Sequence, residues 1–165
     1  KEMAKRIIEI EEMSDENRTF SVGVINGGEW VNCVSSSCSA EVISMAKKQK
    51  NLDEGIATIL SMNKKNSEIK FSVEQSVVRP VWELDDGTKK LFDLNQEICK
   101  GLNLPFSHGS MGGGSDGNFS GALNVPTVDG LGTLGENYHT LKEHIYIDSI
   151  EKRANVIANI VSNLN

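Results

Sequence analysis

Apolar positions in the first part of the chain alternate between the spacing of a helix and the spacing of a strand. Met3, Ile7 and Ile10 recur at helical intervals from the first residues onward. In TFSVGVIN (19–26) apolar side chains occupy alternate positions, which predicts a half-buried strand. Three further segments continue the series: a strand at 31–46 that the serines at 35–37 can interrupt, a helix with its stripe at 52–60, and a strand at 69–73 (IKFSV).

This order of helix, strand, strand, helix and strand corresponds to a ferredoxin-like unit without its first strand. The opening helix has no N-cap residue and no turn before it. We therefore expect residues 1–78 to form an incomplete ferredoxin-like unit, and we expect the sequence to begin inside a domain.

Beyond Arg79 and Pro80 the pattern changes to an alternation of strands and helices. Thr88 is a suitable N-cap for a helix that ends at Gly101. The later elements expected are a strand at 104–108, a short helix at 118–122, strands at 126–131 and 144–147, and a final helix from 148 or 149 whose buried side carries Ile150, Ala154, Ile157, Ile160, Val161 and Leu164. Such alternation predicts a parallel-sheet α/β layer for residues 79–165, with the boundary between the two units near 78–84.

Composition narrows the class of protein. The 165 residues are 38% hydrophobic and 24% charged, which is typical of a globular protein. The net charge of −6 and the lack of a basic run argue against a nucleic-acid partner. No stretch reaches the roughly 18–20 apolar residues of a membrane span, and Cys33, Cys38 and Cys99 include no CxxC pair. We therefore expect a cytoplasmic protein with no membrane contact and no zinc–thiolate site.

The segment GGGSDGNF (112–119) is the first candidate for chemistry. It joins a predicted strand to a predicted helix, where free backbone N–H groups and the helix dipole bind phosphate or carboxylate. Glycines there let an anion approach the backbone closely. An alternative is equally open, namely a glycine-rich turn in which Ser115 or Asp116 only caps the helix. The segment does not match the nucleotide-binding pattern G-x-x-x-x-G-K-[ST].

Three other residues have both a functional and an ordinary interpretation. His139 follows a predicted strand in a glycine-bearing loop, where open α/β sheets place ligands, but a single loop histidine is more often a surface residue. Asp129 is either a site carboxylate or a solvated turn residue, and Arg79 is by default a salt-bridge partner. Taken singly, none of these residues decides the function.

Taken together, two segments resemble a known family. GGGSDGNFSGALNVPTVDGLGTLGENYHT (112–140) is similar to the C-terminal signature of the zinc-dependent exopeptidases related to glutamate carboxypeptidase, aminoacylase and succinyl-diaminopimelate desuccinylase. That signature is a GG-[ST]-D turn, a small helix, an x-P-[TV] strand, a glycine loop and a histidine. VGVINGGEWVNCVSSSCSAEV (22–42) resembles the lid segment of the same family, and the glutamate carboxypeptidase branch fits best.

The resemblance implies a domain organisation and a role for particular residues. Residues 1–78 correspond to a lid and dimerisation domain, and residues 79–165 to the C-terminal part of an α/β catalytic domain. The implied role of His139 is that of a zinc ligand, and Arg79 is implied to grip the substrate carboxylate. Gly113, Gly114 and Ser115 are implied to contact the same carboxylate or the scissile region. Asn32 is implied to contact substrate, often in the partner subunit's active site.

The implied reaction is hydrolysis of an amide bond at two zinc ions, of which this chain supplies one ligand. The implied substrate is a small peptide or N-acyl amino acid with a free carboxylate, cleaved to release a C-terminal amino acid or an acyl group. The implied assembly is a homodimer formed through the lid.

Two departures from the family pattern bear on activity. Ile43 and Met45 stand where the family commonly has Asp-x-Arg, and Val34-Ser35 stands for its Val-Pro. The family's H-x-D motif, Glu-Glu pair and further acidic ligand are absent from these 165 residues. A catalytic zinc ion takes about three protein ligands, so His139 is insufficient. We therefore expect the C-terminal part of a longer protein, inactive alone.

Two competing interpretations stay open. A non-catalytic relative would use its lid for dimerisation and its glycine turn only to bind carboxylates, and Met45 favours this reading. An unrelated anion-binding α/β module is the other, and the match at His139 argues against it.

Overall fold

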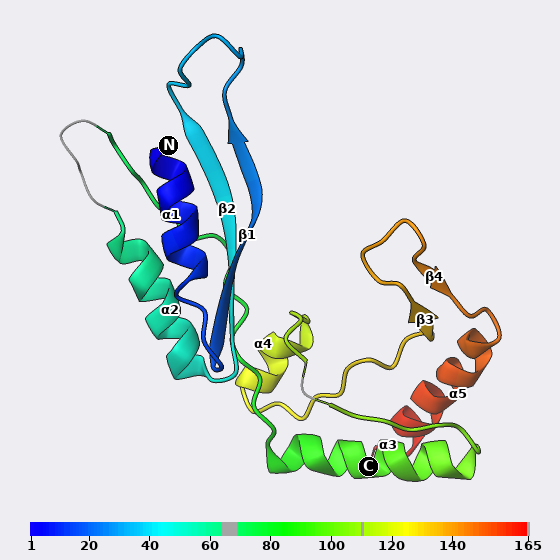
Figure 1. Ribbon diagram of the computed structural model, residues 1–165. Helices are drawn as coiled ribbons and strands as arrows, with labels where there is room; N and C mark the ends of the chain where they lie inside the picture. The colour runs from blue at the N-terminus through cyan, green and yellow to red at the C-terminus, as the bar shows by residue number, and fades with distance from the viewer. Residues whose placement is uncertain (64–68, 110, 165) are drawn as a thin grey trace. The chain divides into compact units, whose positions relative to one another are not determined.

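The computed structural model describes residues 1–63, 69–109 and 111–164. The chain forms two compact units, Lys1–Val81 and Trp82–Asn165 (Figure 1). Within the described ranges, no helix is both long enough and apolar enough to cross a membrane. The assignment of the first unit as a lid and of the second as part of a catalytic domain stays a prediction.

The first unit is an antiparallel two-stranded ribbon with two helices packed against it (Figure 1). Its elements in chain order are α1 (Glu2–Glu11), β1 (Arg18–Gly27), β2 (Cys38–Ala46) and α2 (Gln49–Ser61). Ile10 of α1, Phe20 of β1 and Met62 after α2 form its buried cluster. The apolar residues that set the helical and strand periods in the sequence therefore meet in one core.

Two strand predictions in this unit are wrong in part. The strand expected at 31–46 begins only at Cys38, because residues 28–37 form the loop of the hairpin, where Gly28 has a φ of 84° and the Ser35 hydroxyl donates to the Ser37 carbonyl. Cys33 and Cys38 are exposed in and beside this loop.

The strand expected at 69–73 is reduced to a single bridge residue, Lys70. The alternation itself is meaningful, since Phe71 and Val73 both pack against the buried cluster. The side chain of Asn63, rather than a neighbouring strand, satisfies the backbone of Val73: it accepts from the N–H at 3.0 Å and donates to the carbonyl at 2.8 Å. Among the described residues, the alternation of Phe71 and Val73 therefore reflects packing on the core and not membership of an extended strand.

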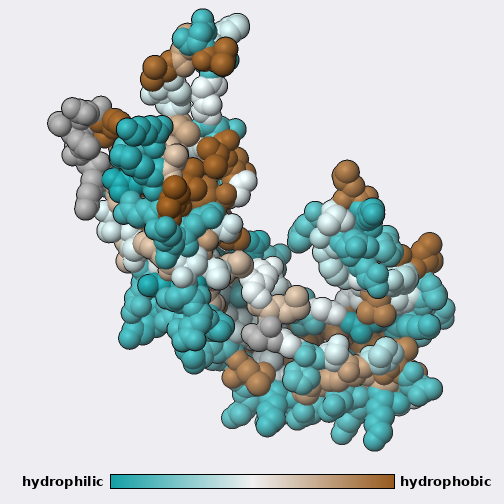
Figure 2. Space-filling view, in the orientation of Figure 1, coloured by the Kyte–Doolittle hydropathy of each residue, from teal (hydrophilic) through white to brown (hydrophobic). Residues whose placement is uncertain are grey.

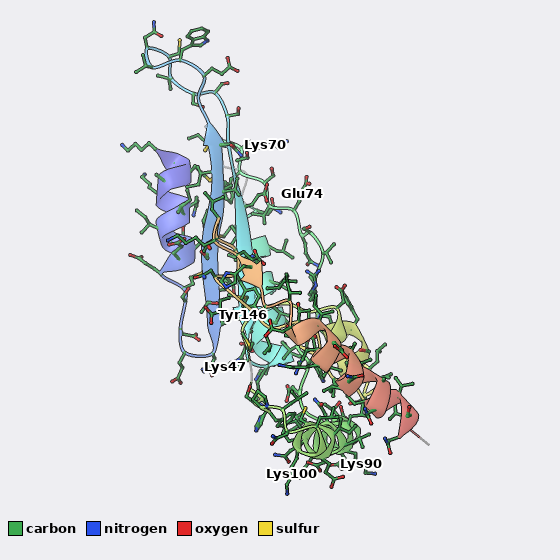
Figure 3. The ribbon with its side chains drawn as sticks, turned by 90° about the vertical axis from the view of Figure 1, so that its right-hand side faces the viewer. Lys47, Lys70, Glu74, Lys90, Lys100 and Tyr146 are labelled. Carbon is green, nitrogen blue, oxygen red and sulfur yellow. The ribbon has the colours of Figure 1, made fainter. Side chains whose placement is uncertain are left out.

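The second unit is built around the contact of two helices. Its elements are α3 (Asp86–Gly101), α4 (Gly117–Ala122), β3 (Gly135–Glu136), β4 (His144–Ile145) and α5 (Ser149–Ser162). Cys99 of α3 and Val156 and Ile160 of α5 form the buried cluster, and Leu104 packs against it. Lys90 and Lys100 lie on the exposed side of α3 (Figure 3).

The parallel sheet expected for this unit is absent from the described residues. The segments 104–108 and 126–131 have no strand structure there, and 144–147 is a strand only at His144–Ile145, where β4 pairs antiparallel with β3. A strand requires a partner with which to share its hydrogen bonds, and no other described segment supplies one. The mixed α/β class is confirmed, although the sheets are small.

The N-cap of α3 is Asp85, not Thr88. The Asp85 carboxylate accepts from the N–H groups of Gly87 at 2.8 Å and Thr88 at 2.9 Å, so the helix begins at Asp86. The Thr88 hydroxyl donates to the same carboxylate at 2.7 Å. These bonds hold the pKa of Asp85 below its ordinary value, with the backbone N–H of Thr88 as the largest cause.

The buried side of α5 was also predicted incorrectly. Val156 and Ile160 are buried against α3, but only Ile160 belongs to the expected stripe. Exposed instead are Ile150, Ile157, Val161 and Leu164. The helix has more apolar surface than α3 covers, so periodicity alone did not indicate which part faces the core.

Candidate functional site

The glycine turn leads into α4 through a reciprocal set of hydrogen bonds. The Ser115 hydroxyl accepts from the Gly117 N–H at 3.0 Å, and the Asn118 side chain accepts from the Ser115 N–H at 2.9 Å. This is the arrangement of a capping box, in which two side chains satisfy N–H groups at the start of a helix. Ser115 therefore caps α4, as the ordinary interpretation of this residue stated. The Asp116 side chain makes no capping bond.

The glycines before this cap are not explained by the fold around them. Gly112 and Gly113 lie outside the left-handed region of φ, and an added Cβ at either would meet no other atom within 4 Å. Both are exposed. Neither backbone shape nor crowding among the described residues requires glycine here, which leaves a bare stretch of backbone beside Ser115.

Ser115 also connects the turn to a carboxylate. Its side chain hydrogen-bonds Asp129, and this bond is the largest cause of a pKa of Asp129 below its ordinary value. The Gly130 N–H donates to the same carboxylate at 2.7 Å. Asp129 therefore stays ionised beside the turn rather than standing alone as a solvated turn residue.

Arg153 of α5 holds the backbone that follows Asp129. Its guanidinium donates to the carbonyl oxygens of Gly132 at 2.9 Å and Leu131 at 3.3 Å, and also to that of Gly130. The planar fork of arginine suits this task, because its several N–H groups reach neighbouring acceptors at once. The final helix is thus tied to the backbone that directly follows Asp129.

Trp82 packs on the small helix of the site. Gly117 and Gly121, four residues apart, lie on one side of α4, and an added Cβ at Gly121 would come within 2.2 Å of the Trp82 ring. At Gly117 the nearest ring atom would be 3.3 Å away. The two glycines therefore let the indole lie directly against the helix, and the buried Trp82 Nε1 has no hydrogen-bond partner among the described residues.

His139 lies in the loop between β3 and β4, and its residue is exposed. It adopts a φ of 64°, uncommon for a residue with a side chain, and its N–H donates to the Glu143 carboxylate at 3.2 Å. Tyr146, beside β4 (Figure 3), has a raised pKa because its hydroxyl hydrogen-bonds Glu136. The backbone hydrogen bond of His139 thus runs to its own loop and not to the glycine turn.

The other two predicted site residues belong to the first unit. Asn32 is exposed in the loop 28–37, where its side-chain oxygen lies 3.8 Å from the Cys33 sulfur. Arg79 is exposed in the irregular segment 71–85. The structure thus brings Ser115 and its glycines together with Asp129, while the roles of Arg79, Asn32 and His139 stay predictions.

The described residues do not form a metal site by themselves. Across residues 1–63, 69–109 and 111–164, no group of three or more His, Cys, Asp or Glu side chains is placed to hold a metal ion. A catalytic zinc ion takes about three protein ligands. Zinc therefore does not fit this chain alone, and His139 suits it only as one ligand among others supplied from outside these residues.

A match to a protein-family model assigns the chain to a family. The model for peptidase family M20/M25/M40 matches residues 2–163, almost the whole sequence. The chain therefore belongs to this family. The resemblance to zinc-dependent exopeptidases drawn from the glycine turn, His139 and the lid segment is confirmed at the level of the family.

Relatives of this M20 chain include two peptidases T. The protein of Bacillus mycoides is 33% identical over 72 residues, 44% of this chain and 17% of that protein. The protein of Shouchella clausii is 29% identical over 102 residues, 61% of this chain and 25% of that protein.

Two solved structures share the fold. A Staphylococcus aureus tripeptidase matches 97% of this chain and 44% of its own, with a TM-score of 0.71 and 23% identity. The aminopeptidase PepT of Bacillus cereus matches 96% and 44%, with a TM-score of 0.63 and 20% identity. The chain spans less than half the length of these relatives.

Sequence reasoning missed two residues of the M20 chain that organise the site. Trp82 was not singled out, although the spacing of Gly117 and Gly121 on a short helix is a signal that something lies close to it. Arg153 gave no signal, because its partners are backbone carbonyls more than twenty residues away in the chain. Asp129 was considered, but its link to Ser115 was not foreseen.

Proposed function

We propose that this chain is part of a longer metal-dependent exopeptidase that hydrolyses short peptides with a free carboxylate. The observation that carries the proposal is the family match over residues 2–163. The printed name of one structural relative, a tripeptidase, favours a substrate of about three residues. A glutamate-carboxypeptidase-like or acyl-releasing activity, which the sequence pattern favours, is the alternative within the same reaction class.

The glycine turn is proposed as the substrate-contacting part of this chain. Gly112 and Gly113 leave the backbone uncovered, and Ser115 and Asp129 hold the turn in one shape. Backbone N–H groups free of side chains suit a carboxylate, because the anion can approach them closely. Gly113, Gly114 and Ser115 are thus assigned to the substrate, with Arg79 as the proposed charge partner of its carboxylate.

His139 is the metal ligand proposed within this chain. Since the described residues offer no cluster of ligands, the remaining donors belong to other parts of the longer protein, and the 165 residues alone are inactive. Zinc is the expected metal. Asn32 and the ribbon that carries it are proposed to contribute to a homodimer formed through the first unit.

The test measures release of amino acids from a panel of tripeptides, dipeptides and N-acyl-glutamates by the protein at its natural length, with and without a chelator. Chelator-sensitive cleavage supports the proposal, and the preferred substrate decides between the tripeptidase and glutamate-carboxypeptidase readings. We expect His139→Ala to abolish turnover and His108→Ala to leave it nearly unchanged, because the His108 ring packs edge-on against Phe92. Equal effects of the two substitutions, or no cleavage of any substrate, would refute it.

A non-catalytic relative is the second candidate. Ile43 and Met45 lie opposite Ser21 and Thr19 in the β1–β2 ribbon, on the face away from Phe20, where the family commonly has an acidic residue and an arginine. An exposed isoleucine and a methionine there supply no charge for a substrate. If the natural-length protein binds small peptides but cleaves none, this second reading holds.

A further inference from the structure

Thr88 is a polar residue on the buried side of α3 in this M20 chain. It is 6% exposed and shares that side with Asn95 and Cys99, which are also buried. The outer side of the helix is hydrophilic (Figure 2). A hydroxyl on the buried side of a helix costs free energy unless it makes hydrogen bonds, so its partners show what it holds in place.

The Thr88 hydroxyl connects the start of α3 to the segment 125–130. It donates to the carboxylate that caps the helix at 2.7 Å and accepts from the backbone N–H of Thr127 at 3.2 Å. Beside it, Gly87 leaves room for Pro126, whose Cγ would lie only 2.5 Å from an added Cβ. The segment 125–130 therefore lies directly on the first turn of α3, held there by one hydrogen bond and one close contact.

Thr127 reaches α4 with both branches of its side chain. Its hydroxyl oxygen lies 2.9 Å from that of Ser120 and 2.7 Å from the carbonyl oxygen of Val125, both within hydrogen-bond distance. Its methyl carbon lies beside Gly117, where an added Cβ would stand 3.4 Å away, an ordinary van der Waals distance. A threonine at this position therefore makes a polar and an apolar contact with the same short helix.

The same segment contacts the glycine turn at Asp129. The Asp129 carboxylate hydrogen-bonds the Ser115 side chain, and the Ser115 hydroxyl in turn accepts from the Gly117 N–H at 3.0 Å. Residues 125–130 are thus joined to the first turn of α3, to α4 and to the end of the glycine turn. They form a bridge between a long helix with a buried face and the exposed turn.

We propose that Thr127 is a positioning residue, which fixes the glycine turn on α3 and thereby sets the affinity for the substrate carboxylate without touching the substrate. Gly112 and Gly113 are exposed, and glycine has the greatest backbone freedom, so the turn takes its shape from its neighbours. Binding groups that move by a fraction of an ångström lose much of their effect. The inference rests on the proposed function, in which this turn receives the carboxylate. Asp129 lies closer to the turn, but its own charge would complicate a substitution there, whereas Thr127 is uncharged.

The first test measures amide hydrogen exchange of residues 115–119 in the natural-length protein. Thr127→Val keeps the size of the side chain and removes the hydroxyl, so exchange across 115–119 should become several-fold faster. Thr127→Ser keeps the hydroxyl and should recover most of the protection. Ser149→Ala is the matched control, because Ser149 is buried and its hydroxyl accepts from the backbone N–H of Leu134, at 3.0 Å, rather than from the turn or α4. That variant should leave exchange at 115–119 unchanged.

The second test measures the KM and kcat of the natural-length protein for trialanine. Thr127→Val should raise KM about tenfold and change kcat less than about twofold, since it weakens binding in the ground state and in the transition state alike. Trialanine amide has no carboxylate, so its inhibition constant as a competitor should change less than about twofold. A purely structural defect would weaken both ligands or lower kcat. Thr127→Ser should restore most of the KM for trialanine.

Unchanged exchange at 115–119 in Thr127→Val overturns the proposal. Faster exchange with an unchanged KM overturns it as well, and so does equal weakening of trialanine and its amide. If the protein cleaves no peptide, the proposed reaction fails, and the dissociation constant of trialanine measured by calorimetry takes the place of KM with the same expected loss. Absence of any trialanine binding would refute both proposals.

Discussion

Gly121 is the position where one added methyl group tests the packing of the site most directly. An alanine Cβ there would lie 2.2 Å from Cδ1 of Trp82 and 2.4 Å from its Cγ and Nε1. These distances are far inside van der Waals contact, and the atoms belong to a rigid ring, so Trp82 or α4 must move. Overpacking of this kind costs about 1–3 kcal/mol.

The helix propensity of alanine offsets part of this cost. Replacing glycine by alanine inside a helix gains up to about 1 kcal/mol, and less in a helix of six residues. We therefore expect Gly121→Ala to destabilise the second unit by about 1–2 kcal/mol. Gly101→Ala is the matched control, because an added Cβ at the end of α3 meets nothing within 4 Å. That variant should be neutral or slightly more stable.

Urea unfolding followed by tryptophan fluorescence measures both effects. The chain has only Trp30, which is 71% exposed, and Trp82, whose Nε1 is buried, so a shift of emission on unfolding reports mainly on Trp82. In a Trp82→Leu background, followed by circular dichroism, the penalty of Gly121→Ala should shrink markedly. An unchanged or higher urea midpoint for Gly121→Ala, with unshifted Trp82 emission, would show that Trp82 does not pack closely on Gly121.

Two further predictions concern the second unit. Asp85 has a lowered pKa in the folded state, so the stability that its carboxylate contributes is fully present above the ordinary pKa of about 3.9 and is lost as the pH falls through the lower folded pKa. In thermal melts at decreasing pH, the parent should therefore lose stability more steeply than Asp85→Asn. Parallel pH profiles of the two proteins would contradict this. Arg153→Met removes the bonds to the carbonyls of residues 130–132 and should cost about 1–2 kcal/mol after allowance for solvent screening. Arg153→Lys should recover only part of that loss in the same denaturation assay, and full recovery would mean that charge alone matters.

The elements that sequence predicts well here are those whose cause is local. Among the described residues, the helices α1, α2, α3 and α5 follow from apolar spacing, α4 follows from its position after the glycine turn, and β1 follows from its alternation at 19–26. The segments 69–73, 104–108 and 126–131 read as strands because their apolar residues alternate or cluster, but side-chain packing and not a backbone ladder explains that pattern in the described residues. Strand formation depends on a partner that the segment itself does not encode.

In the candidate site, too, local contacts could be predicted from the sequence and long-range contacts could not. Ser115 as a cap was foreseen, because its hydrogen bonds span only three residues. The contacts of Trp82 with Gly121 and of Ser115 with Asp129 join residues distant in the chain, so no local pattern contains them. The exposed side of α5 was predicted as its buried side, because apolar spacing identifies an apolar face but does not identify which part of that face packs against α3.

The three cysteines of this protein should react with thiol reagents at two very different rates. Cys33 and Cys38 are exposed at the hairpin loop, whereas Cys99 has no exposed surface and its thiol lies 3.5 Å from the Asn95 side chain. A thiol-reactive dye will therefore label the loop at once and reach Cys99 only when α3 and α5 separate. The rate of the slow label reads the opening of the helix pair directly, in a mixture and without any substitution.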